Sequence, residues 1–90
     1  MTNTANSFPQ FRAYSNRQVF FKILNTSSLE ELKLFGQNYS LKSLQATTWP
    51  DRLMIEDLLH VHHQTIEVIT EDEYETILLQ AQQTLKRIDL

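Results

Sequence analysis

Three histidines stand close together and could bind a transition metal through their imidazole nitrogens: His60, His62 and His63. Metal-binding histidines on one helix are usually spaced i and i+4, so that both rings converge on one ion. His60 and His63 are spaced i and i+3, and the nearest carboxylates, Glu56 and Asp57, lie one turn earlier. The alternative is that the histidines complement the dipole at a helix C-terminus. We therefore predict no metal site and leave the role of the three histidines open.

Acidic side chains are concentrated in one run: Glu67, Glu71, Asp72, Glu73 and Glu75. One interpretation is a solvated helix start, since carboxylates stabilise the positive end of a helix dipole. The other is a docking surface that steers a basic partner protein, with Leu79 as an apolar anchor on the same exposed side. On this hypothesis, four residues contact the partner: Glu71, Asp72, Glu75 and Leu79.

Basic and aromatic residues are interleaved near the N-terminus, in the set Phe8, Phe11, Arg12, Tyr14, Arg17, Phe20, Phe21 and Lys22. Proteins that bind single-stranded nucleic acids stack bases on such rings beside basic side chains. Rings near a central strand are more often core, and a net charge of −3 disfavours nonspecific binding to nucleic acid. A nucleic-acid-binding regulator is therefore the alternative hypothesis.

Motifs for catalysis are missing from the sequence. With Gly36 as its one glycine, the chain has no phosphate-binding loop and no dinucleotide fingerprint. It has no cysteine nucleophile and no G-x-S-x-G elbow. We therefore predict a protein that is not an enzyme and uses no cofactor.

The composition is that of an ordinary globular domain, with 90 residues of which 41% are hydrophobic and 21% charged. This length suits one hydrophobic core, so we predict a flexible polar arm over residues 1–7 and a single domain over residues 8–90. The lack of cysteine fits a reducing compartment, and neither a signal peptide nor a membrane-spanning run is recognisable. We expect a small acidic cytoplasmic protein that does not bind membranes.

The acidic run needs an element to position it, and the C-terminal sequence predicts a long amphipathic helix. Thr70 is a suitable N-cap and Glu73 completes a capping box, while Lys86 and Arg87 would complement the negative end of the dipole. At about 100° per residue, six apolar side chains fall on one stripe: Tyr74, Ile77, Leu78, Ala81, Leu85 and Ile88. Leu79 is the one apolar residue on the polar side. A sheet must cover the stripe.

Three strands are predicted before this helix. Residues 18–24 are apolar on both faces, which indicates a central strand. Residues 39–46 alternate with a slip that a bulge or an edge position would explain. Residues 65–70 form a short β-branched run, whereas Pro9 marks residues 8–14 as a loop or an edge strand.

Two further helices are expected. One is short, with a capping box at its start, Leu29, Leu32 and Phe35 on its apolar side and Gly36 just after its end. The other begins near Pro50, because proline suits the first turn of a helix.

These elements follow one another in the order β-α-β-α-β-α. The expected fold is α+β or small α/β, with a three-stranded sheet packed against helices; an antiparallel arrangement of the same elements is the alternative. The leading functional hypothesis is a small non-enzymatic regulator that binds another protein: an adaptor, an inhibitor or an immunity-type factor. Self-association into a homo-oligomer through the last helix is a further hypothesis.

Overall fold

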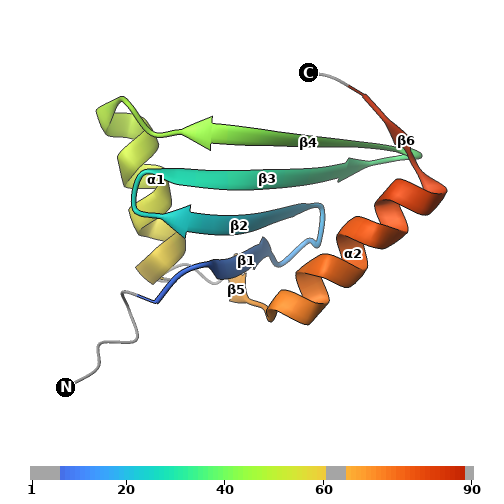
Figure 1. The fold of residues 1–90 in the computed structure, drawn as a ribbon, viewed down its shortest axis with the longest axis horizontal. Helices are drawn as coiled ribbons and strands as arrows, with labels where there is room; N and C mark the ends of the chain where they lie inside the picture. The colour runs from blue at the N-terminus through green and yellow to red at the C-terminus, as the bar shows by residue number, and fades with distance from the viewer. Residues whose placement is uncertain (1–6, 61–64, 89–90) are drawn as a thin grey trace.

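A mixed β-sheet forms the middle of the structure (Figure 1). The computed structural model describes residues 7–60 and 65–88, so only Ser7 of the predicted arm lies within the described residues. In them the chain forms six strands and two helices: β1 (Gln10–Tyr14), β2 (Val19–Asn25), β3 (Ser28–Phe35), β4 (Asn38–Gln45), α1 (Trp49–His60), β5 (Ile66–Val68), α2 (Glu71–Thr84) and β6 (Lys86–Arg87). The strand order is β5-β1-β2-β3-β4-β6, and the neighbours are antiparallel except β4 and β6, which are parallel.

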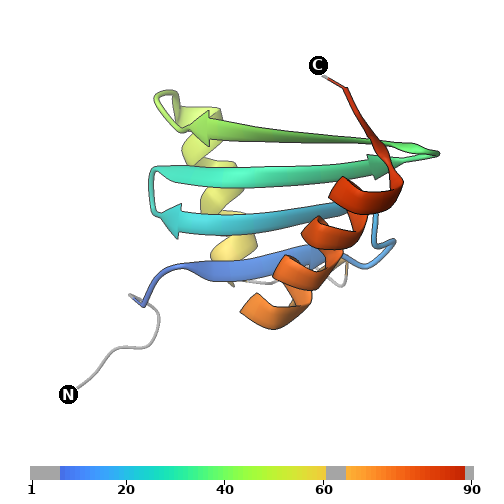
Figure 2. The ribbon, with the colours of Figure 1, turned by 45° about the vertical axis from the view of Figure 1, so that its right-hand side comes forward.

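The two helices cover opposite faces of the sheet. In Figure 1, α2 crosses the front of the sheet at the right and α1 lies behind it at the left; the turned view of Figure 2 shows the same layers. The front cluster includes Phe11, Phe20, Leu32, Tyr39, Tyr74 and Ala81. The rear cluster includes Phe21, Ile23, Leu29, Ala46, Ile55 and Leu58. Neither described helix combines the length and apolar character that crossing a bilayer requires.

The chain after the β2 turn is a strand, so the short helix predicted there is wrong. Leu29 and Leu32 are three residues apart, which suits one face of a helix. In β3 they instead point to opposite faces, Leu29 into the rear cluster and Leu32 into the front cluster. Gly36 does not end a helix; it has a φ of 63° in the turn between β3 and β4, a conformation that glycine adopts at little cost. A strand buried on both faces can therefore imitate a helical spacing.

The slip of alternation in β4 follows from the placement of the helices. Tyr39 and Leu41 pack in the front cluster beneath α2, whereas Leu44 and Ala46 pack in the rear cluster beneath α1. The register with β3 is unbroken, so the bulge is absent from this pair. The predicted edge position is correct for part of β4, because β6 pairs only with Asn38 and Tyr39 at the start of this strand. The buried side chains therefore change from one face of β4 to the other along the strand. The reason is that α2 covers the front face at one end of the strand and α1 covers the rear face at the other end.

β1 lies inside the sheet, between β5 and β2, and not at an edge as predicted. Pro9 precedes Gln10, the first residue paired with β2, so its missing N–H does not interrupt the ladder. The central position predicted for β2 is confirmed, with Phe20 buried in the front cluster and Phe21 in the rear cluster.

The last helix has the predicted cap but ends earlier than expected. Oγ1 of Thr70 accepts a hydrogen bond from the Glu73 N–H at 3.1 Å, and the helix ends at Thr84. Lys86 and Arg87 form β6 instead of the last helical turn, so they do not complement the helix dipole.

The edge of β4 explains why the chain leaves the helix. Two backbone carbonyls point outward there and accept from the end of the chain: Gln37 from the Lys86 N–H at 3.0 Å and Tyr39 from the Ile88 N–H at 2.9 Å. These bonds replace the last helical turn with a sixth strand. The predicted three-stranded β-α-β-α-β-α fold with a long C-terminal helix is therefore wrong, and the observed order is β-β-β-β-α-β-α-β.

Candidate functional site

The side of α2 that faces away from the sheet carries all four residues predicted to contact a partner. Tyr74 and Ala81 are buried on the opposite side of the helix, where Ile77 and Leu78 also pack. Six of the exposed residues on this outer side are Glu71, Asp72, Glu75, Leu79, Gln82 and Gln83. We call these six residues the α2 outer surface. They lie together because positions three and four apart share one side of a helix.

The rest of the acidic run is occupied within the protein by Arg17. Its guanidinium pairs with Glu67 of β5 at 2.9 Å and with Glu73 of α2 at 2.8 Å. The hydrogen bond to Glu73 is the main cause that raises the pKa of Arg17. The acidic run is thus divided: Glu67 and Glu73 connect β5 and α2 to the β1–β2 turn, and the three remaining acids face solvent.

Leu79 is 54% exposed near the middle of the α2 outer surface. It belongs to a set of large apolar side chains that solvent reaches: Leu24, Trp49, Leu53, Val68 and Leu79. Single exposed leucines are common on protein surfaces. What distinguishes Leu79 in this set is its place on one helix side with three exposed carboxylates.

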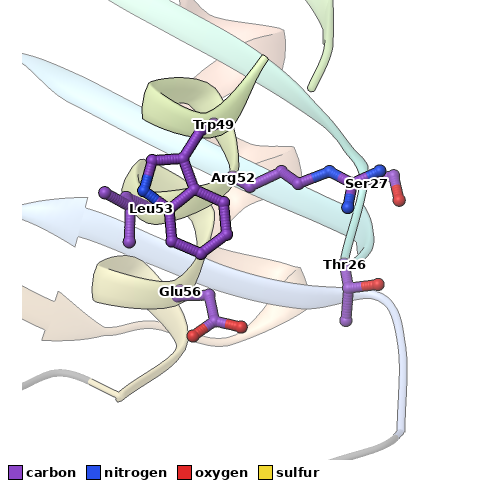
Figure 3. Close-up of a pocket in the computed structure, with 6 residues that line it drawn as sticks. All are labelled: Thr26, Ser27, Trp49, Arg52, Leu53 and Glu56. Atoms are coloured by element: carbon purple, nitrogen blue, oxygen red, sulfur yellow. The ribbon is translucent and has the colours of Figure 1, made fainter. Parts of the chain in front are cut away.

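A second surface, on α1, was not predicted from the sequence. Trp49 is 69% exposed and, with Leu53, lines a shallow pocket of about 170 Å³ between α1 and the β2–β3 turn. Figure 3 shows the Arg52 side chain extending from α1 toward Ser27. The signal was present in the sequence, because Trp49 and Leu53 are spaced i and i+4 outside the arc of the buried Ile55 and Leu58.

The histidines lie only partly within the described residues. His60 is the last residue of α1 and is exposed, whereas His62 and His63 lie outside the described residues. In residues 7–60 and 65–88, no group of three or more potential ligands is placed to hold a metal ion.

The interleaved basic and aromatic residues are mostly core. Phe11, Phe20 and Phe21 are buried in the two clusters, and Phe8 and Tyr14 pack partly against the rear cluster. Buried rings cannot stack on the bases of a nucleic acid. Phe11, Phe20 and Phe21 therefore provide no stacking platform.

Arg12 is buried and contributes to structure. It is 6% exposed, and its Nε donates to the Leu58 carbonyl oxygen at 2.8 Å, in the last turn of α1. Its other groups donate to the Phe11 carbonyl at 2.8 Å, to Gln10 Oε1 at 2.7 Å and to the Leu59 carbonyl at 3.4 Å. Burial lowers the pKa of this guanidinium. A cation at the negative end of a helix dipole holds α1 on the sheet.

No protein-family model, curated protein or solved structure matches the chain.

Proposed function

We propose that this protein is a small non-enzymatic regulator that binds a partner protein through the α2 outer surface. The observation that carries the proposal is the division of the acidic run by Arg17, which leaves Glu71, Asp72 and Glu75 exposed around Leu79. The partner on this view presents a basic surface with an apolar contact at its centre.

The acids and the leucine contribute differently to binding. Exposed carboxylates steer a basic partner and raise the association rate, an effect that salt screens over about 8 Å at physiological ionic strength. Leu79 supplies apolar area, and burying its exposed half contributes about 1 kcal/mol. Substituting Leu79 should therefore speed dissociation, whereas substituting the acids should slow association.

The place of action that we propose is the cytoplasm. Its support is chemical: the chain has no cysteine, and its acidic, charged surface depends on no disulfide. A reducing compartment costs such a protein no stability.

The proposed function is tested by capture of a partner from the native host, with two matched double variants. One carries Glu75→Lys and Leu79→Ser on α2, beyond the first helical turn, so the N-cap is untouched. The control carries Leu53→Ser and Glu56→Lys on α1, also an exposed leucine and an exposed acid.

We expect the wild type and the α1 variant to retain the same partner and the α2 variant to lose it. Quantitative mass spectrometry of the captured proteins gives the comparison. Equal capture by the α2 variant would refute the proposal, and loss confined to the α1 variant would transfer the docking site to the pocket beside Trp49.

A further inference from the structure

Three lysines lie on the rear face of the sheet: Lys33 on β3, Lys42 on β4 and Lys86 on β6. Each directly follows a leucine that packs in the front cluster: Leu32, Leu41 and Leu85. Because successive side chains on a strand point to opposite faces, Lys33 and Lys42 belong to the rear face. Lys86 pairs with Asn38, the residue before Tyr39 of the front cluster, so it belongs to the rear face as well. Lys42 and Lys86 are exposed and Lys33 is half-buried.

Apolar side chains accompany these lysines. Val19 pairs with Lys33 across β2 and β3, and Phe35 lies two residues further along β3; both are half-buried. Glu31 is the acid on the same strand face, opposite Lys42. We call these six residues the rear basic patch: Val19, Glu31, Lys33, Phe35, Lys42 and Lys86. Among the described residues, none of its three lysines lies within 4 Å of a carboxylate.

We infer that the α2 outer surface of one copy docks on the rear basic patch of a second copy. This inference rests on the proposed function and names its partner. Three exposed carboxylates on one surface match three lysines on the other, and Leu79 matches the apolar side chains of Val19 and Phe35. Complementary charge and an apolar contact at the centre are what a specific docking surface needs.

The placement of the two surfaces fixes the type of assembly. The α2 outer surface lies in front of the sheet and the rear basic patch lies behind it. Because the two surfaces lie on opposite faces, two rigid copies cannot bury both surfaces of each against the other. The contact is therefore head-to-tail, and each added copy leaves one α2 outer surface and one rear basic patch free. Such contacts close into rings or extend as filaments, and they do not stop at a two-fold dimer.

The inference is tested by sedimentation velocity or light scattering over a concentration series at low salt. We expect the average mass of the wild type to rise past that of a dimer and to return toward the monomer at about 1 M salt, where charges are screened beyond about 3 Å. Three charge variants accompany it. One carries Glu71→Lys, Asp72→Lys and Glu75→Lys; another carries Lys33→Glu, Lys42→Glu and Lys86→Glu; the third combines all six.

We expect each triple variant to associate about tenfold more weakly at low salt, since three exposed ion pairs are lost. The six-fold variant keeps the wild-type net charge of −3 with both surfaces inverted, so its self-association is restored. If a reversal impairs folding, neutral versions of the two triple variants, with Gln or Asn for the acids or Gln for the lysines, should still associate more weakly than the wild type at low salt.

Several results would overturn self-docking. These are a wild type that stays monomeric, a plateau at the dimer, or a six-fold variant no stronger than the triples. Retention of an acidic peptide or an oligonucleotide by the rear basic patch of a monomeric protein would assign that patch to another occupant. The proposed function survives these outcomes if the α2 double variant still loses its partner from the host lysate, so the two failures are distinguishable.

Discussion

The Tyr74 phenol on α2 donates a hydrogen bond to Glu30 Oε1 on β3 at 2.7 Å. Tyr74 is completely buried, and its ring lies 5.4 Å from the ring of Phe11 on β1. One side chain therefore joins the helix to two strands of the front face. This contact fixes which side of α2 faces the sheet, and so which side carries the acids and Leu79.

Replacing Tyr74 with Phe should lower the free energy of unfolding by about 1.5 kcal/mol, because the bond to the Glu30 carboxylate is lost while the ring remains. Urea unfolding measures the difference. If the free energy of unfolding changes by no more than experimental error, the Tyr74 hydroxyl gains no more from Glu30 in the folded protein than from water in the unfolded chain.

The same residue predicts an alkaline limit to stability. Burial raises the pKa of Tyr74 above its ordinary value, and the hydrogen bond to Glu30 raises it further. The unfolded chain loses this proton near pH 10 while the folded protein keeps it, so the stabilisation is complete below about pH 10 and decreases as the pH rises above that value. Urea midpoints from about pH 9 to about pH 11 should fall more steeply for the wild type than for Tyr74→Phe. Parallel curves would contradict this linkage.

Replacing Arg12 with Met should lower the free energy of unfolding by about 2 kcal/mol, because the buried hydrogen bonds that its guanidinium donates to the Leu58 and Phe11 carbonyls are lost. Arg52→Met on the exposed side of α1 is the matched control and should change stability by less than about 0.5 kcal/mol. Equal effects of the two substitutions would show that Arg12 does not hold α1 on the sheet.

The β3–β4 turn gives a test of the corrected fold. An added Cβ at Gly36 would meet nothing within 4 Å, so Gly36→Ala costs only backbone strain at a φ of 63°, about 1 kcal/mol. Gly36→Asn should cost less, because asparagine tolerates this conformation better. Chemical denaturation of both variants checks the order, and an alanine variant as stable as wild type would argue against this turn.

The pairs made by Arg17 are exposed, so salt should control their contribution. Arg17→Gln should lower the melting temperature at low ionic strength, and the difference should shrink at about 1 M salt. A difference independent of salt would assign the effect to the turn, where Arg17 has a φ of 60°.

Local signals in the sequence predicted the parts of the fold that depend on neighbouring residues. A few neighbouring residues were enough to predict four features: the Thr70 cap, the buried side of α2, the start of α1 and the central position of β2. The spacing of Leu29 and Leu32 was misread because a strand covered on both faces gives the same interval as a helix. β6 depends on carbonyls at the edge of β4, about 50 residues earlier in the chain, which no local window contains.

The candidate site was predictable in part for the same reason. Helical periodicity placed Leu79 with Glu71, Asp72 and Glu75 on one exposed side. It could not show that Arg17 removes Glu67 and Glu73 from the acidic run, because that turn meets α2 only in the folded sheet. The rear basic patch was equally inaccessible, since Lys33, Lys42 and Lys86 come from three strands whose pairing was not foreseen.

The claim that the α2 outer surface is the docking site is tested most directly by photo-crosslinking in the native host. A photoreactive residue at position 79 is compared with one at position 53, a similarly exposed leucine on α1. The proposal predicts a discrete crosslinked species from position 79, which Glu75→Lys weakens, and none from position 53. Crosslinks from position 53 with none from position 79 would contradict it.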